Sequence, residues 1–374
     1  ELGPPAEPTE AFGAARPEWY FLFLFQMLKY FDGSLGFNTE LVGAIVLPGL
    51  LFGFMFAMPL IARKKFGHHL NVTVIVAIVS AAAYLTWEAK QEDNYYLNHP
   101  DDTQSEAYKK SKRFHDEVGR SEKEFELIQQ LVKDYGIPLE GPAVLQQRDP
   151  LTMGRRLFRR QCASCHAYSH DEYAIAGPPN PDATSDSPLN YGAPDLAHFG
   201  SVKWITGLLS NDADNGIRSE SYFGKTLHIE GEMAEHVHET MWAVDVDRQA
   251  LATQIEQVAW ALSAEAQLPY LDYAANQEKI DAGIAHLNDD TLGCIGCHNY
   301  GDNEDGYVIN LNGYASADWL TKMISDPTQT GFYDGGSEND RMPSFHNEAT
   351  KLLTPREIEL LVRFLREDRT LLEE

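Results

Sequence analysis

The chain has 374 residues, 43% of them hydrophobic, and a formal net charge of −26. This length allows two or three domains, and the acidic balance excludes nucleic acid as a partner because its phosphates would be repelled. Residues 1–89 contribute 5 Lys or Arg and 7 Asp or Glu, so a charge of −24 lies in residues 90–374. Such a field either steers a basic partner or serves solubility alone, and both interpretations stay open.

The N-terminal part is predicted to be a surface segment followed by an aromatic stretch. Residues 1–16 are rich in Pro, Ala and Gly, as extended segments are. Pro17-Glu18-Trp19-Tyr20 comes next, and residues 21–31 indicate a short amphipathic helix near a membrane interface. The chain begins at Glu1 rather than Met and shows no signal peptide, so we expect a further segment upstream.

Two uncharged apolar runs predict two transmembrane helices. Residues 41–62 and 70–87 approach the roughly 20 residues that a bilayer-spanning helix needs. The first run contains Gly and Pro residues, which suit a packed membrane helix better than a soluble core helix. Arg63-Lys64-Lys65 lies between the runs, and short basic loops stay on the cytoplasmic side. We therefore expect both flanking parts of the chain to face the opposite side.

A charged connector follows the second apolar run. Its composition predicts a mainly helical segment over residues 91–148, which ends at Gly136-Ile137-Pro138 and Gly141-Pro142. We expect this connector to hold the rest of the chain away from the membrane.

Two Cys-x-x-Cys-His motifs contain all four cysteines of the chain. They are Cys162-Ala-Ser-Cys165-His166 and Cys294-Ile-Gly-Cys297-His298. This spacing is the attachment signature of c-type haem, because two thiols on one helical turn reach one porphyrin while the adjacent imidazole reaches the iron. A disulfide, a redox dithiol or a zinc site would not explain a His directly after both pairs. The sequence therefore predicts two covalently attached haems c.

The chain repeats itself after each motif. Residues 195–211 match residues 310–326 without a gap, and each copy precedes a Met and an amphipathic helix. Such repetition is typical of duplicated structural units. The two closing helices are predicted from these apolar stripes: Leu251, Ile255, Val258, Leu262, and Ile358, Leu361, Val362, Leu365. Thr354 and Glu357 predict a capping box, and we expect each closing helix to pack against the first helix of its haem domain.

Each haem iron needs a sixth ligand from further along the chain. Met342 lies twelve residues before the Thr354 cap, and Met233 lies twelve residues before Asp245, just ahead of the earlier closing helix. Equivalent placement favours Met233 in the first copy and Met342 in the second. The alternatives to Met233 stay open: Met241, His228, His236 and His238. Ligation by Met and His raises the reduction potential relative to two imidazoles.

Residues 15–31 resemble the Pro-Glu-Trp-Tyr loop of cytochrome b, and of its split C-terminal half, subunit IV, in quinol-oxidising cytochrome bc complexes. The two membrane helices that follow in that family match the two apolar runs. Beyond them the chain resembles the fused cytochrome b/c subunit of bacterial menaquinol:cytochrome c reductases. The resemblance implies that Glu18 accepts a proton from quinol and that Pro17, Trp19 and Tyr20 line the quinol pocket. A plain interfacial anchor is the alternative for this tetrapeptide.

The fold implied is all-α, with two transmembrane helices of the cytochrome b C-terminal half followed by two tandem class I cytochrome c domains. The expected ranges are 1–38 for the quinol-oxidation loop and interfacial helix, 39–90 for the membrane helices, 91–148 for the connector, and 149–270 and 271–374 for the cytochrome c domains. The family's split half has a further membrane helix before the loop, which this sequence does not show.

The function implied is that of a subunit of a proton-translocating quinol:cytochrome c oxidoreductase, inactive alone, with menaquinol or ubiquinol as substrate. Neither apolar run holds a His pair and all cysteines are assigned, so b haems and a Rieske 2Fe-2S cluster are expected on partner subunits. The expected partners are a cytochrome b N-terminal-half subunit, a Rieske iron–sulfur protein, and a soluble cytochrome c or terminal oxidase as acceptor.

The expected setting is a dimeric complex in the bacterial plasma membrane, with the N-terminal loop and the haem domains on the periplasmic side. Two other functions compete with this one. The first is a membrane-tethered dihaem electron carrier without quinol chemistry, and the second is a cytochrome-bearing oxidase subunit.

Overall fold

A computed structural model describes the chain over ten stretches: residues 15–31, 41–61, 65–170, 174–177, 193–212, 217–218, 231–243, 245–289, 292–332 and 342–373. The chain divides into two compact units, residues 1–135 and 136–374. The described residues are mostly helical, as expected, and include one short antiparallel pair of strands, β1 (Asn211–Asp212) and β2 (Ile217–Arg218). The predicted domain ranges, including the two tandem cytochrome c domains, stay predictions.

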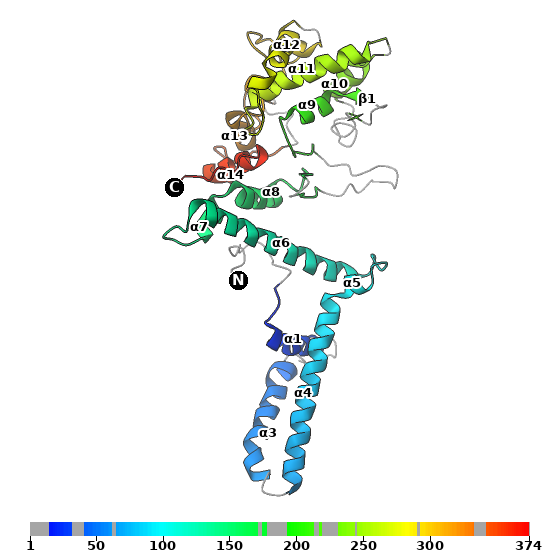
Figure 1. Cartoon of the computed structure of the whole chain (residues 1–374), viewed down its shortest axis with the longest axis vertical. Coiled ribbons are helices and arrows are strands. Elements are labelled where there is room, and N and C mark those ends of the chain that lie inside the picture. The colour runs from blue at the N-terminus through cyan, green and yellow to red at the C-terminus, as the bar shows by residue number, and fades with distance from the viewer. Residues whose placement is uncertain are drawn as a thin grey trace. The chain divides into compact units, whose positions relative to one another are not determined.

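Two long apolar helices dominate the first half of the first unit (Figure 1). The π-helical turn η2 (Val42–Val46) continues into α3 (Leu47–Ile61), and α4 spans Lys65–Asp93. Both are long and apolar enough to cross a membrane, and the apolar stretch of each helix is not buried by other described parts of the chain. Side chains such as Phe56, which is 84% exposed, are expected to face lipid or a partner subunit. The second helix extends to Asp93, beyond the predicted end at Trp87.

Shorter helices gather at the end of α4. The turn η1 (Trp19–Phe21) leads into α1 (Leu22–Lys29), which packs against α4 (Figure 1). The chain leaves α4 through α5 (Tyr95–Asn98) and enters α6 (Glu106–Tyr135), a helix of 30 residues. The predicted connector is therefore helical, as expected.

The second unit has one continuous hydrophobic core, whose buried members run from Leu157 to Leu372. Its helices and helical turns are α7 (Ala143–Arg148), η3 (Pro150–Gly154), α8 (Arg155–Gln161), α9 (Val202–Leu209), α10 (Glu232–Glu235), η7 (His236–Met241), α11 (Arg248–Ala266), η8 (Ala274–Asn276), α12 (Gln277–Asn288), η9 (Cys294–Gly296), α13 (Ala317–Ser325) and α14 (Pro355–Leu365).

The sequence repeat is also a structural repeat. Ser201 and Ser316 cap α9 and α13 by accepting hydrogen bonds from the backbone N–H of Trp204 and Trp319, at 3.1 and 3.2 Å. The indole Nε1 of each Trp donates to the carbonyl oxygen nine residues earlier, at 2.9 and 3.2 Å. The same local sequence therefore forms the same capped helix twice.

The two copies meet at equivalent residues. The rings of Phe199 and Tyr314, which match in the repeat, have centroids 5.6 Å apart. A Cβ atom added at Gly200 would lie 2.6 Å from the Cβ of Ala315, which is again its match. The two copies of the repeat therefore contact each other through matched positions.

The two apolar stripes of the closing helices are buried, as predicted. Their side chains are at most 6% exposed in α11 and at most 5% exposed in α14. Thr354 and Glu357 form the predicted capping box at the start of α14. The burial of a whole helix face explains why these helices form at this position.

The partner of each closing helix differs from the prediction. We expected each to cover the first helix of its own repeat, and this was wrong: α11 packs against α12, while α14 packs against η3 and α8 (Figure 1). Only residues 267–276 separate α11 from α12. Consecutive helices joined by a short segment usually lie side by side, which gives α11 the nearer partner.

Close helix crossings leave no room for a side chain at Gly283. A Cβ atom there would collide with the carbonyl oxygen of Gln257 and would lie 2.9 Å from the Cβ of Ala261, both on α11. We expect Gly283→Ala to lower the free energy of unfolding by about 1–3 kcal/mol, the usual cost of overpacking. Thermal unfolding of the detergent-solubilised protein measures this. Gly119→Ala, on α6 with no heavy atom within 4 Å, is the matched control. Equal midpoints for the two variants would contradict the crossing.

Candidate functional site

Both Cys-x-x-Cys-His motifs form a single tight turn. In the first, which follows α8 directly, the backbone N–H groups of Cys165 and His166 donate to the carbonyl oxygen of Cys162, at 3.0 and 2.8 Å. The second motif repeats these two bonds onto the carbonyl oxygen of Cys294, at 3.3 and 2.9 Å. None of the four cysteines forms a disulfide. Each motif therefore presents two thiols on one turn, as the predicted haem attachment requires.

The imidazoles of both motifs are held by the same kind of hydrogen bond. The Nδ1 of His166 lies 2.8 Å from the carbonyl oxygen of Pro194, and that of His298 lies 2.7 Å from the carbonyl oxygen of Ile309. A carbonyl oxygen can only accept, so Nδ1 carries the hydrogen and Nε2 keeps its lone pair for a metal. Pro194 and Ile309 each directly precede a copy of the repeat. The repeat therefore carries the residue that orients the imidazole.

Burial lowers the pKa of both imidazoles below the ordinary value for His. The charged form is disfavoured because the low-dielectric surroundings do not solvate it. Iron binds the neutral imidazole, so the depressed pKa favours the ligating form. Two thiols outside any disulfide and a neutral imidazole with a fixed tautomer fit a covalently bound haem at each motif.

A zinc site at the motifs receives no support from the described residues. Within them, the group of at least three side chains close enough to share a metal ion is His170, His198 and Glu367, and it contains no cysteine. A structural zinc site would need four ligands closed into a tetrahedron around the thiolates. The part of the chain that the structure describes does not bring such ligands to either Cys pair.

Met233 lies next to the second motif. Glu232, beside it on α10, accepts a hydrogen bond from the Tyr307 hydroxyl at 3.5 Å, and this hydroxyl lies 3.3 Å from the Cys297 Sγ. The Nε2 of His236 lies 2.8 Å from the carbonyl oxygen of Leu292, two residues before the motif. Met233 itself is half-buried and packs against the core. Its place in the sequence, in contrast, predicts it as a ligand at the first motif.

Met342 is also half-buried against the core. The segment that follows it is fixed to the end of α13, because Ser344 donates its hydroxyl to Asp326 at 2.8 Å. The backbone N–H of Phe345 donates to the carbonyl oxygen of Ser325 at 3.1 Å. Both methionines proposed as iron ligands are thus on fixed segments, and their ligation stays a prediction.

The alternatives to Met233 differ in what surrounds them. Met241 is 6% exposed and lies within the hydrophobic core. The Nε2 of His236 is engaged with a backbone carbonyl, and His238 is half-buried on η7. His228 lies outside the described residues. Packing therefore makes Met241 a core residue and leaves Met233 the better-placed methionine.

The tetrapeptide forms an aromatic surface beside a carboxylate. Glu18 is exposed, and its backbone carbonyl closes the turn η1 by accepting from the N–H of Phe21 at 2.7 Å. Trp19 and Tyr20 are 72% and 49% exposed, with ring centroids 5.6 Å apart in an edge-to-face arrangement. Pro17 is half-buried. Such an exposed aromatic group suits a bound apolar ligand or a partner subunit.

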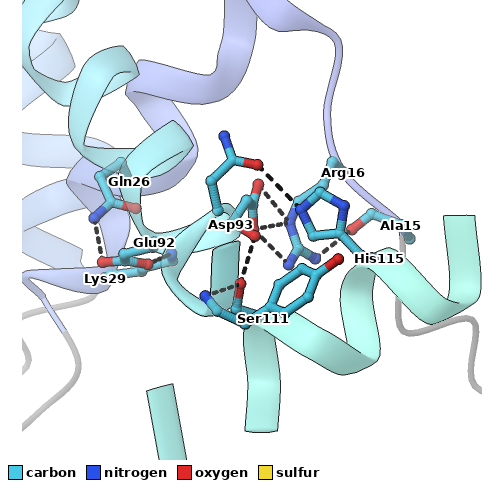
Figure 2. Close-up of polar contacts among 10 residues, drawn as sticks. Ala15, Arg16, Gln26, Lys29, Glu92, Asp93, Ser111 and His115 are labelled. Atoms are coloured by element: carbon cyan, nitrogen blue, oxygen red, sulfur yellow. Dashed lines mark hydrogen bonds and ion pairs between the residues drawn. The ribbon is translucent and has the colours of Figure 1, made fainter. Parts of the chain in front are cut away.

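An ion pair fixes the start of this segment to the end of α4 (Figure 2). The Arg16 guanidinium donates to the Asp93 carboxylate at 2.8 Å from Nη2 and 3.1 Å from Nε, and it lies over the Phe114 ring at 4.5 Å from the centroid. The carbonyl oxygen of Asp93 accepts from the Ser111 hydroxyl at 2.6 Å. Arg16 therefore links the N-terminal segment to both α4 and α6.

A second polar group ties α1 to the same end of α4 (Figure 2). Glu92 accepts hydrogen bonds from Gln26 at 2.7 Å and from Lys29 at 2.5 Å. The N-terminal segment and the connector α6 thus reach the same end of α4, as the predicted topology requires. Residues 62–64 of the basic loop lie outside the described residues, so the cytoplasmic assignment of the other end stays a prediction.

Arg16, Asp93 and Glu92 are not among the predicted site residues. A signal was present: three acids, Glu88, Glu92 and Asp93, follow the second apolar run, and the aromatic segment is poor in charge apart from Arg16, Glu18 and Lys29. Charged groups at the end of a membrane helix generally need partners. This rule would have suggested the pairing, although not which residue meets which.

The fold and these sites define a helical protein with two helices long and apolar enough to cross a membrane and two Cys-x-x-Cys-His motifs suited to haem. Residues 5–98 match the family described as Cytochrome b(C-terminal)/b6/petD. The chain is also similar to two proteins named menaquinol:cytochrome c reductase cytochrome c subunit. That of Bacillus subtilis (strain 168) is 34% identical over 117 residues, which are 28% of this chain and 45% of the relative. That of Geobacillus thermodenitrificans is 36% identical over 88 residues, 22% of this chain and 34% of the relative.

The chain therefore spans less than half the length of these curated relatives. No solved structure matches it. Taken together, a cytochrome b C-terminal segment and relatives named as cytochrome c subunits support the predicted resemblance to a fused cytochrome b/cytochrome c subunit of the bc type. Both kinds of match imply haem cofactors, in agreement with the two motifs.

The two motifs should attach haem independently. Replacing Cys162 and Cys165 together with Ser is expected to reduce covalently bound haem from two per chain to one, because a haem c needs its thioether bonds to survive denaturation. Haem staining after denaturing electrophoresis, with quantitation of the denatured haem, measures this. Replacing Cys294 and Cys297 is the matched experiment. A wild-type chain without covalent haem would contradict the assignment of both motifs.

Proposed function

We propose that the chain is a membrane subunit of a quinol:cytochrome c oxidoreductase. It forms part of the quinol-oxidation site and passes electrons through two haems c to an acceptor. The observation that carries this proposal is the Arg16-anchored aromatic segment at the end of α4, in a chain that also has two motifs suited to haem. The names of its relatives favour menaquinol over ubiquinol.

Glu18 serves as the proton acceptor in this proposal. Oxidation of a quinol releases two protons and two electrons, so a base must lie beside the bound ring. Glu18 is exposed next to the aromatic surface of Trp19 and Tyr20. Pro17 fixes the backbone before it and, with the two aromatic residues, lines one side of the quinol pocket. The accepted proton then leaves to water on the same side.

Bound haem c supplies a one-electron redox couple. The chain holds it through Cys162 and Cys165 in one site and Cys294 and Cys297 in the other. His166 and His298 would ligate the iron, since each imidazole is already oriented by a backbone carbonyl. Met233 and Met342 would provide the other iron ligands and so raise the reduction potentials.

The acceptor is a basic partner, such as a small soluble cytochrome c, or a terminal oxidase. A charge of −24 on residues 90–374 would attract a basic surface and increase the rate of encounter. The effect depends on ionic strength, because salt screens interactions beyond about 10 Å at 0.1 M. The acidic surface would then attract the acceptor in addition to keeping the protein soluble.

The remaining redox groups belong to partner subunits. Among the described residues of α3 and α4, the histidines are His68 and His69, adjacent to each other near the start of α4, so these helices offer no pair that could hold a b haem. A cytochrome b N-terminal-half subunit supplies the b haems, and a Rieske protein supplies the 2Fe-2S cluster. The complex is a proton-translocating dimer in the bacterial plasma membrane, with Glu18 and the haem motifs on the periplasmic side.

The test of the quinol site is Glu18→Gln in the assembled complex. Loss of a general base is expected to slow quinol oxidation by about 10²-fold or more, with unchanged haem content. Quinol-dependent reduction of cytochrome c by the purified complex measures this. Glu122→Gln, an exposed position on α6, is the matched control. Unchanged turnover, or a purified complex without b haem and Rieske protein, would favour the tethered electron carrier.

Arg16 is expected to act as a positioning residue. Arg16→Ala should raise KM for quinol and lower kcat by about 10-fold or more, because small misplacements of a reacting group are costly. Arg16→Lys should restore part of the activity, since it keeps the charge but not the two-point contact. Steady-state kinetics of the complex measure both values. Arg113→Ala, an exposed position on α6, should have no effect. A wild-type KM and kcat in Arg16→Ala would contradict this role.

A further inference from the structure

We propose that the two haem sites exchange their sixth ligands between the repeats. The haem attached at Cys162 and Cys165 takes Met342, and the haem attached at Cys294 and Cys297 takes Met233. This pairing is the reverse of the one that the order of the sequence favours. The inference rests on the proposed attachment of haem c to both motifs, but not on the proposed quinol chemistry.

The first observation is the packing around the first motif. The helix α8 leads directly into Cys162, and α14 crosses η3 and α8. A Cβ atom at Gly154 would lie 2.6 Å from the carbonyl oxygen of Leu360 on α14. The Phe364 ring clusters with the two rings that flank the first motif, its centroid 6.0 Å from that of Phe158 and 4.6 Å from that of Tyr168. The C-terminal helix thus covers the first motif.

The second observation is the packing around the second motif. The helix α12, which precedes this motif, pairs with α11. Lys279 on α12 donates to Glu256 on α11 at 2.6 Å, and His286 lies 3.0 Å from the side-chain oxygen of Gln257. The closing helix of the first repeat therefore covers the first helix of the second repeat. Each closing helix therefore covers the first helix of the other repeat.

The third observation concerns the contacts of the residues on either side of Met233. Met233 and His236 are three residues apart, a spacing that puts side chains on the same helix face. A Cβ atom at Gly293, the residue before Cys294, would lie 2.8 Å from the Cε1 of His236. Glu232 on the other side of Met233 contacts Tyr307, whose hydroxyl lies beside Cys297. The segment that carries Met233 thus touches the second motif before and after its cysteines.

The segment after Met342 is bonded to α13 and to the start of α14. Ser344 and Phe345 bond to the end of α13, and the N–H of Leu353 donates to the carbonyl oxygen of Phe345 at 3.1 Å. Leu353 directly precedes the Thr354 cap of α14. Because α14 covers the first motif, the segment of Met342 is attached to the group of helices that surrounds His166. Because α11 packs against α12 and α14 packs against α8, the two exchanges involve equivalent elements of the repeats.

The experiment removes one haem and then asks which methionine the other haem uses. In a full-length Cys294→Ser/Cys297→Ser background only the first haem stays attached. Met–Fe(III) bonding gives an absorbance band near the red end of the visible spectrum. We expect Met342→His to abolish this band and Met233→His to leave it. In the Cys162→Ser/Cys165→Ser background the expected result is the reverse.

Histidine replaces each methionine because it can still ligate the iron, so the variants are expected to keep a six-coordinate haem and a folded chain. Loss of the band with Met233→His in the first-haem background would establish sequential pairing and overturn the proposal. A band that survives both substitutions would also overturn it, because the sixth ligand would then be another residue. Absence of covalent haem would instead refute the haem attachment itself, and quinol oxidation plays no part in this readout.

Discussion

The second unit depends on two close helix crossings, each made possible by a residue without a side chain. Gly154 admits the backbone of α14, and Gly283 admits that of α11. Dispersion and apolar burial act over short distances, so backbones this close bring two whole helix faces into contact. The buried stripes of α11 and α14 are the result. Since α8 runs directly into Cys162 and α12 precedes Cys294, fixing these helices also fixes both haem motifs.

The hydrogen bond that orients each imidazole has a consequence for redox chemistry. In both motifs the acceptor of the Nδ1–H is a backbone carbonyl, that of Pro194 or Ile309, and not a carboxylate. A carboxylate partner would increase the electron density on the imidazole and favour the oxidised metal, whereas a neutral carbonyl does so less. The proposed methionine ligands would likewise raise the reduction potential. Two haem sites built this way would be suited to pass electrons to an oxidising acceptor.

The local features of the chain could be predicted from its sequence, but its long-range pairings could not. The apolar runs, the Thr354 capping box, the turn of each motif and the repeat depend on neighbouring residues, and the structure has them. An amphipathic stripe predicts that a helix face is buried but does not predict which element covers it. The packing of α11 against α12 and of α14 against α8 could therefore not be predicted. The pairing of Arg16 with Asp93 joins residues 77 positions apart, and composition alone does not select that partner. The second apolar helix extends to Asp93 because Gln26 and Lys29 satisfy Glu92, which hydropathy does not register.

Asp93 connects the N-terminal segment of the first unit to its connector helix α6. Its carboxylate holds Arg16, which precedes the tetrapeptide, and its carbonyl oxygen holds Ser111 on α6. The side chains of Arg16 and Asp93 are 23% and 20% exposed, so water screens this pair less than a surface ion pair. A partly buried ion pair that loses one member leaves an uncompensated charge, which makes the arrangement costly to disrupt. Asp93 therefore joins the apolar helix, the start of the aromatic segment and the connector, which helps to hold the tetrapeptide in place although its own side chains are largely exposed.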